Sequence, residues 1–272
     1  MVIWNRLPYF EKANEMSTTF SPRFLAIAIS TLFTATASLS GNAVAASIWD
    51  LKNDWSDTTN PNGPWSLNSD STSLPHISGS TLPGGVLVSQ PGWAACSSCR
   101  GFWFKAAFEP SNIDWKTGDI VLHTQDQFSN PYDHAANVTW SSPLSGVISI
   151  AGSVWMDDFF AARGNQWNLY VKGVLVSTGT LSGTDIYDRA NPYSLLTGSG
   201  GATPLSAVSV VSGDVIKLEI VRTTFDGFFV GTNLTVSAVP EPGTNAFLLL
   251  GIATSVLVGI SKKSTKPRAS DA

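Results

Sequence analysis

Hydrophobic and polar residues alternate along several stretches in the second half of the chain. The alternation is clearest in Ala136–Trp140, Val147–Trp155, Trp167–Val171 and Val215–Val221. A period of two residues is typical of a strand with one buried face. Turn residues separate these stretches, and helix-forming residues are scarce. The pattern predicts an all-β fold, which we expect to be a single jelly-roll-like β-sandwich.

The rest of the domain shows a weaker pattern. Ala46–Leu51 can form a first strand and Phe228–Val236 a last one. Residues 66–92 are rich in Ser, Gly and Pro, so we expect long loops there, with one strand near 85–89. Residues 177–206 are also expected to be loop-rich.

Two apolar runs interrupt this pattern, one near each end of the chain. Near the start, Phe24–Leu39 is followed by the small residues Ala43, Val44 and Ala45. This order is typical of a secretory signal peptide, cleaved here after Ala45 or the next residue.

The first fifteen residues fit such a signal poorly, because they contain four charged side chains. A start at Met16 gives a more conventional signal, so residues 1–15 are candidates for a mis-called start. We expect residues 1–45 to be a signal peptide and residues 46–238 to form one domain.

The second apolar run, residues 246–260, lies between a Pro-rich segment and a basic tail. The Pro-rich segment is Val239, Pro240, Glu241 and Pro242. The basic residues of the tail are Lys262, Lys263, Lys266 and Arg268. Proline cannot continue a strand or a helix interior, so the first segment is predicted to be an exposed, extended hinge. The run predicts a transmembrane helix at about 244–261 with a cytoplasmic C-terminus.

These three parts in this order resemble the PEP-CTERM sorting signal of exported bacterial proteins, over Val239 to about Arg268. The resemblance implies recognition by an exosortase-type membrane protease and transient anchoring in the inner membrane. Transfer to the cell surface or to an extracellular exopolysaccharide matrix would follow. The alternative is an ordinary C-terminal membrane anchor with a Pro-rich stalk. In both cases, the residues before Val239 lie outside the cytoplasm.

The net charge of the domain and two short resemblances limit the kinds of ligand that we expect. Residues 46–238 contain nine Lys and Arg against sixteen Asp and Glu, a net charge of 9 − 16 = −7. A nucleic-acid partner is disfavoured, because phosphate binding needs a basic face. The turn Asn60–Trp65 and the hairpin pattern at 136–155 resemble exported bacterial β-sandwich modules of the carbohydrate-binding or galactose-binding-like kind. This resemblance implies a glycan ligand.

Aromatic residues are the strongest sign of binding. Nine tryptophans lie between residues 46 and 238, more than one sandwich core normally needs. A Trp ring offers a flat apolar face with one donor, which suits the C–H face and hydroxyls of a sugar. Those in alternating strands are expected in the core: Trp103, Trp140, Trp155 and Trp167. The ligand-binding candidates are the loop aromatics Trp55, Trp65, Trp93, Trp115, Tyr132 and Tyr187.

Cys96 and Cys99 are the two cysteines of the chain. A redox pair would need a following helix in a βαβ context, and a zinc site would need two further ligands at suitable spacing. Neither pattern is visible. We favour a small-loop disulfide, since an exported protein folds in an oxidising compartment.

The segment His123–His134 is rich in side-chain oxygens and amides. Asp126 and Asp133 are the candidate ligands for Ca²⁺, because calcium binds oxygen donors. The same groups could bind sugar hydroxyls, and a solvated loop is the alternative. No other cofactor is indicated.

No nucleophile motif, phosphate loop or zinc-protease motif occurs, so we do not expect an enzyme. The sequence predicts an exported surface or matrix protein that binds extracellular polysaccharide without catalysis. A structural or adhesive matrix protein is the first alternative, and a glycan-active hydrolase or lyase is the second.

Overall fold

A computed structural model describes most of the predicted domain. The described residues are 46–81, 87–88, 90–97, 99, 101–111, 113–125, 135–157 and 162–240. Residues Val44–Glu241 form one compact unit. The predicted signal peptide, Glu241, Pro242, the apolar run and the basic tail lie outside the described residues. Within the described part, no helix combines the length and the apolar character needed to cross a bilayer.

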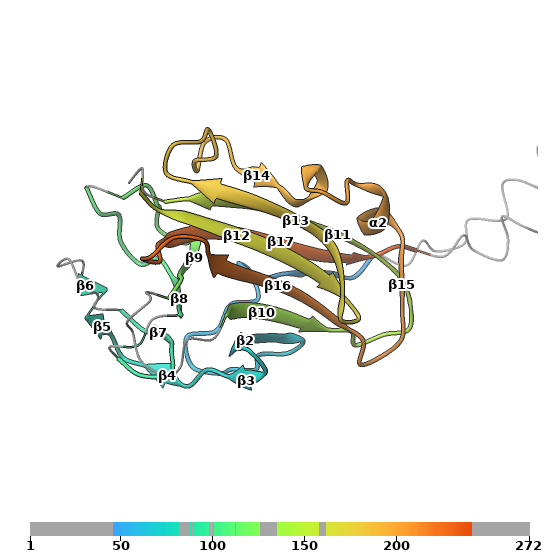
Figure 1. The fold of residues 1–272 in the computed structure, drawn as a ribbon. Helices are drawn as coiled ribbons and strands as arrows, with labels where there is room; N and C mark the ends of the chain where they lie inside the picture. The colour runs from blue at the N-terminus through green and yellow to red at the C-terminus, as the bar shows by residue number, and fades with distance from the viewer. Residues whose placement is uncertain are drawn as a thin grey trace, which may run out of the picture. The chain divides into compact units, whose positions relative to one another are not determined.

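The larger sheet has nine antiparallel strands (Figure 1). Its main order is β14 (Tyr193–Ser194), β11 (Gly146–Met156), β17 (Phe229–Ala238), β9 (Ile120–His123), β8 (Phe102–Lys105), β7 (Gly92–Trp93) and β4 (His76–Ile77). Two further strands join it, β1 (Ile48–Asp50) beside β17 and β15 (Val208–Val210) beside β11.

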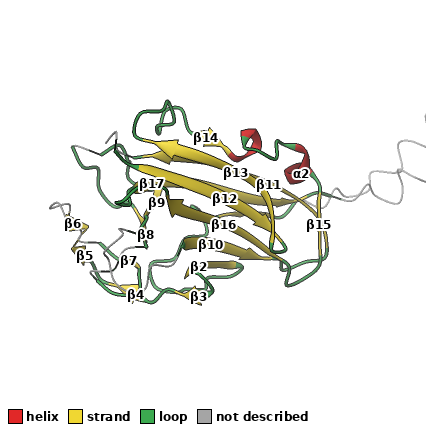
Figure 2. Cartoon of the chain, viewed as in Figure 1, coloured by secondary structure: helices red, strands yellow, loops and turns green. Residues whose placement is uncertain are grey.

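The second sheet has six antiparallel strands and lies against the first (Figure 1). Its order is β13 (Val174–Ser182), β12 (Gly164–Val171), β16 (Val215–Arg222), β10 (Ala136–Ser141), β2 (Trp65–Ser69) and β3 (Thr72–Ser73). A separate hairpin joins β5 (Ser80–Thr81) to β6 (Leu87–Val88). Helix in the described part is limited to η1 (Leu195–Thr197) and α2 (Thr203–Ser206), as Figure 2 shows.

The predicted β-sandwich is therefore confirmed. Along β16, Ile216, Leu218 and Ile220 are buried between the sheets, whereas Lys217 and Glu219 point outward. Such alternation places every second side chain of a strand in the core. All four tryptophans expected in the core are buried: Trp103, Trp140, Trp155 and Trp167. Three of them pack in the core between the sheets, whereas Trp155 lies on the opposite side of β11 from the core residues Val154 and Met156.

Two loop predictions were wrong. Residues 66–92 contribute strands from β2 to β7, of which β6 lies within the strand expected near 85–89, and β13 runs into the second expected loop region as far as Ser182. These strands lack a run of alternating apolar residues because most of them are short or at sheet edges. Pairing with a neighbouring strand satisfies their backbone groups without much side-chain burial.

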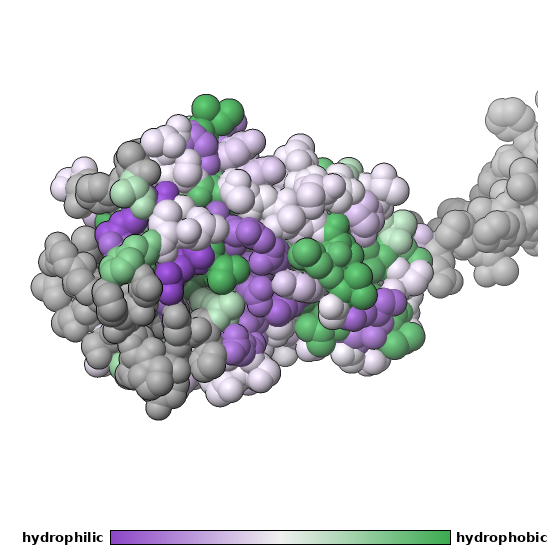
Figure 3. Space-filling model, viewed as in Figure 1, coloured by the Kyte–Doolittle hydropathy of each residue, from purple (hydrophilic) through white to green (hydrophobic). Residues whose placement is uncertain are grey.

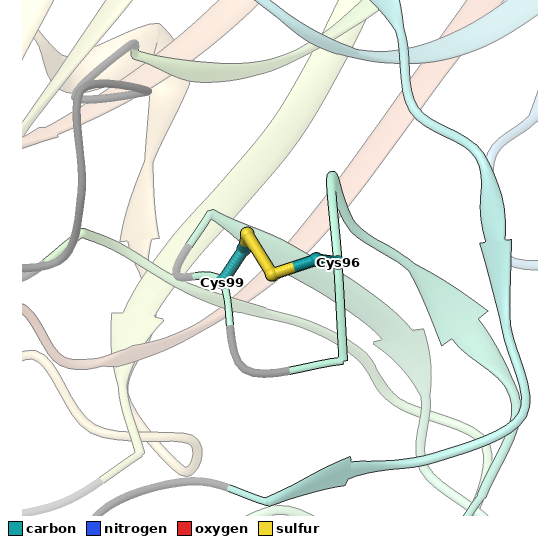
Figure 4. The surroundings of a disulfide bond; sticks show 2 residues. All are labelled: Cys96 and Cys99. Carbon is teal, nitrogen blue, oxygen red and sulfur yellow. A yellow bond between two sulfur atoms is a disulfide. The ribbon is translucent and has the colours of Figure 1, made fainter.

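Cys96 and Cys99 form a disulfide in the connection between β7 and β8 (Figure 4). Their Cα atoms lie 4.9 Å apart, and the Cys99 N–H donates to the Cys96 carbonyl at 3.1 Å. The bond closes a tight turn next to the buried Trp93.

Candidate ligand-binding face

The outer face of the six-stranded sheet carries polar side chains that are aligned by the strand register. Asn137 of β10 lies opposite Asn68 on one side and Glu219 on the other. Glu219 lies opposite Asn168, which lies opposite Thr178. Residues in such pairs have neighbouring side chains on the same face. The result, called the polar row here, is Ser73, Asn68, Asn137, Glu219, Asn168 and Thr178.

A second row runs parallel to the first. Thr139 lies opposite Ser66 and Lys217, and Lys217 lies opposite Tyr170. The second row thus consists of Ser66, Thr139, Lys217 and Tyr170, and its one aromatic ring stands on a strand rather than in a loop.

Hydrogen bonds hold the β2 and β10 half of the face. The Asn68 Nδ2 atom donates to Asn137 Oδ1 at 3.4 Å and to Thr139 Oγ1 at 3.1 Å. The Ser66 hydroxyl donates to Asn68 Oδ1 at 2.7 Å. Asn137 donates to the Asp70 carbonyl at 2.8 Å, which ties the strand to the β2–β3 turn. These amides are therefore fixed in orientation before any ligand arrives.

Glu219 is the centre of the other half. Its carboxylate accepts from Lys217 Nζ at 2.6 Å, Tyr170 OH at 3.2 Å and Asn168 Nδ2 at 3.5 Å. The Lys217 ammonium also lies 4.3 Å from the centroid of the Tyr170 ring, a cation–π contact. Partial burial, and then the nearby Glu219 charge, raise the pKa of Tyr170. The phenol therefore stays protonated and donates at neutral pH.

The side-chain oxygen of Asn168 accepts hydrogen bonds from two residues. Gln166 Nε2 donates to Asn168 Oδ1 at 2.8 Å, and Thr178 Oγ1 lies 2.8 Å from the same oxygen. The contacts continue the hydrogen-bonded network to the edge strand β13.

The amides of the polar row are recessed within the face. Asn137, Asn68 and Asn168 are 0%, 5% and 6% exposed, beside taller side chains such as Tyr170. Figure 3 views the molecule from this side and shows hydrophilic residues gathered over β12, β16 and β10. Asn is depleted in strands. Hydrogen bonds from Asn137 to the Asp70 and Ala135 carbonyls explain one of the three, which leaves Asn68 and Asn168. Amides do provide both donors and acceptors, the groups that hydroxyl-rich ligands need.

Three of the predicted binding aromatics are core residues instead, which corrects the sequence-based prediction. Trp65, Trp93 and Trp115 are buried. Their indole N–H groups bond inside the fold, to Asp54 Oδ2, the Ser56 carbonyl and the Phe108 carbonyl at 3.0, 3.0 and 2.9 Å. Position in a turn or short strand does not set the direction of a side chain, and these three point inward.

The other aromatic candidates do not belong to the rows either. Trp55 and Tyr187 are half-buried and pack against the core. The Tyr187 ring stacks on Tyr193 with centroids 4.2 Å apart. Tyr132 lies outside the described residues. A signal for the rows was present in the sequence, namely the polar positions that alternate with core positions in Ala136–Trp140, Trp167–Val171 and Val215–Val221.

The candidate calcium ligands Asp126 and Asp133 also lie outside the described residues. In the described part, no group of three or more His, Cys, Asp or Glu side chains could hold a metal ion.

A separate acidic cluster lies away from the rows. Asp119 forms a bidentate ion pair with Arg189, in which Arg189 Nη2 lies 3.2 Å from Asp119 Oδ1. The Lys52 ammonium lies 3.4 Å from the same oxygen. Burial opposes the Asp119 charge, but these bonds and the Lys116 N–H outweigh it and lower the pKa of Asp119. Asp157 is fully buried, and burial raises its pKa well above the usual value.

No family model and no curated protein matches the sequence. Distant solved structures include the K3 cleaved adhesin domain of Lys-gingipain from Porphyromonas gingivalis (12% identity, 71% of this chain and 99% of that chain, TM-score 0.36). A xylan-binding module, CBM15, shares 9% identity over 72% of this chain and 99% of its own, with a TM-score of 0.30. Xylanase10C from Cellvibrio japonicus, in complex with xylopentaose, shares 10% identity over 67% and 28%, with a TM-score of 0.28. Similarities this distant do not identify a ligand.

Proposed function

We propose that the polar row and the second row bind an extracellular polysaccharide without catalysis. The observation that carries this proposal is the row of polar side chains that crosses all six strands, with the recessed amides of Asn68 and Asn168 among them. Sugar hydroxyls both donate and accept hydrogen bonds, and so do amides and hydroxyls. A fixed set of such groups binds a hydroxyl-rich ligand at little ordering cost.

The shape of the row favours a chain over a single sugar. Neighbouring strands lie about 4.8 Å apart, so six strands give a row of about 24 Å. The one carboxylate of the two rows, Glu219, is paired with Lys217, and the domain as a whole is negatively charged. A neutral polysaccharide lying across the strands fits both features.

The protein is further proposed to be exported and sorted through its C-terminal signal. Its partners would be an exosortase-type membrane protease, the inner membrane during transit, and the extracellular matrix. Support comes from the end of β17: Val239 and Pro240 follow it directly and are exposed, so a protease could reach the segment. Mass spectrometry of the mature protein should find the residues after about Pro242 missing. A mature protein that keeps Lys262 in the membrane fraction would contradict this proposal.

The binding proposal is tested by calorimetry of the full chain with the host exopolysaccharide and a glycan panel, with and without Ca²⁺. Saturable binding is expected, and the Asn68→Ala/Asn168→Ala variant should bind at least about tenfold more weakly, a loss of about 1.4 kcal/mol. Asn233→Ala is the matched control, because Asn233 is exposed on β17 of the other sheet.

Other outcomes would redirect the function. Binding that is unchanged in the double variant would place the site elsewhere. Absence of binding to every glycan would favour the structural or adhesive role. Release of sugar fragments would make the protein a hydrolase or lyase.

A further inference from the structure

Exposed apolar side chains gather at one end of the sandwich. Within the described part, seven large hydrophobic residues are exposed, and five of them form what we call the apolar end. These are Ile48 (63% exposed), Val174 (64%), Leu175 (49%), Val211 (59%) and Val239 (39%). The other two, Ile186 and Phe225, lie in connections at the opposite ends of the strands.

Strand register places three of the five together in the larger sheet. The Val239 N–H donates to the Val147 carbonyl at 2.8 Å, beside the start of β11. On the other side of β11, Gly146 pairs with Val210, which precedes Val211. Ile48 pairs with Ser237, two residues before Val239.

The β12–β13 hairpin brings the remaining two to the same end. The Lys172 N–H in its turn donates to the Val215 carbonyl at 2.9 Å, and Lys172 Nζ donates to the Ser209 carbonyl at 3.0 Å. Val174 and Leu175 directly follow this turn. Figure 3 shows hydrophobic residues gathered at this end, beside the position of β15 in Figure 1.

Charge is sparse at the apolar end. The connections 142–145, 172–173 and 211–214 contain two charged residues, Lys172 and Asp214, whose side chains lie 3.9 Å apart. At the opposite end, Arg163 pairs with Asp226, and further acidic residues follow β13. One end of the domain is thus apolar and close to neutral, which suits an apolar partner without a strong charge.

The chain leaves the domain at this same end. Five residues separate Pro240 from the apolar run 246–260, so the two are at most about 20 Å apart even when fully extended. A bilayer that holds the run therefore lies within reach of the apolar end.

We propose that the apolar end contacts the lipid surface while the chain is anchored, with its aliphatic side chains inserted among the headgroups. This rests on the proposed membrane segment at about 244–261. The five side chains stand on loop tips and strand ends, and binding of such apolar groups at the boundary of headgroups and acyl chains increases with the apolar area that is buried there. Contact on this side leaves the outer face of the six-stranded sheet open to polysaccharide.

The test uses the full chain in phosphatidylcholine vesicles. An environment-sensitive fluorophore is attached to the Leu175→Cys variant, and to Ile186→Cys as the control, since Ile186 is 69% exposed at the other end. Lipids that carry a quencher on the acyl chain should quench the label at position 175 severalfold more strongly than the label at 186. High salt should not abolish the difference, because the contact is apolar.

Two outcomes would overturn the proposal. In the first, the chain floats with the vesicles but the labels at positions 175 and 186 are quenched equally. The second is energy transfer between labels on two chains without lipid quenching, which would assign the end to a second copy. A chain that does not float with vesicles would overturn the membrane segment as well, whereas glycan binding in calorimetry stands or falls separately.

Discussion

Two carboxylates in the acidic cluster have opposite electrostatic roles. Asp157 Oδ1 accepts from Trp155 Nε1 at 2.7 Å, but its Oδ2 has no hydrogen-bond partner among the described residues. Burial makes the charged form costly, so the neutral acid is favoured in the folded state. Asp119, held by Arg189, is favoured as the charged form.

For Asp157, the folded protein holds its proton more tightly than the unfolded chain. Its contribution to the free energy of unfolding therefore falls as the pH rises from about 4 through the raised pKa. The Asp157→Asn variant should show a flatter pH dependence and gain stability, relative to the wild type, as the pH rises above about 4. Denaturant unfolding at several pH values measures this. Asp57→Asn is the matched control, because exposed Asp57 accepts the Trp55 indole N–H at the same 2.7 Å; an equal change in both variants would refute the burial effect.

For Asp119, the pH dependence of stability has the opposite sign, because its pKa is lowered. Its charge stabilises the fold above the unfolded pKa, and that contribution is lost as the pH falls through the lowered folded pKa. Arg189→Ala should cost about 1–2 kcal/mol at pH 7, less than a fully buried pair because Arg189 is partly exposed. In urea unfolding, the difference from the wild type should shrink below pH about 4. A difference that is constant with pH would mean that Arg189 acts by packing alone.

At the scale of elements, strands with few apolar residues carry the candidate face. β2 and β13 offer little hydrophobic signal, yet each pairs with a strand whose inner side is fully buried. The outward side of β10, β12 and β16 can then carry polar residues, because the core is filled from the inner side.

The Asn168→Val variant tests whether this residue serves ligand binding or the stability of the strand. Val is favoured in strands and Asn is not, so the free energy of unfolding should stay within about 1 kcal/mol of the wild type or rise. Glycan binding should still be weakened, since Val offers neither donor nor acceptor. Thermal unfolding and calorimetry on one preparation measure both, with Asn233→Val as the control on β17. A large loss of stability would instead assign the Asn to the fold.

The β7–β8 connection supplies a second test at this scale. A disulfide that closes a loop of four residues is expected to contribute about 2 kcal/mol, because it restricts the unfolded chain. Cys96→Ala/Cys99→Ala should lose about that amount in denaturant unfolding. Reductant should destabilise the wild type similarly and leave the variant unchanged. A variant that responds to reductant would show that the loss has another cause.

At the scale of the whole molecule, net charge bears on the ligand. Binding of a neutral polysaccharide should change by less than about twofold between low and high salt, because no net charge is screened. An anionic polysaccharide should bind weakly or not at all at low salt, since the domain carries a charge of 9 − 16 = −7 over residues 46–238. Calorimetry at two ionic strengths measures this, and strong salt-sensitive binding of a polyanion would contradict it.

The sequence by itself determined the fold class, because a period of two residues needs no tertiary information. It also determined the inward face of β12 and the place of Trp140 and Trp167 in the core. The two-residue strands β4, β5 and β7 were missed, since their sequences carry too few residues to show any period, whereas β6 lies within the strand expected near 85–89.

Only the tertiary structure decided which polar residues meet. Asn68, Asn137 and Asn168 are 31 to 100 positions apart in the chain, and sheet order and register bring them into one row. The same folding turned Trp65, Trp93 and Trp115 inward, because the direction of a turn side chain depends on the whole packing around it. Periodicity is a local property that the chain carries by itself, whereas a binding face depends on contacts between distant strands.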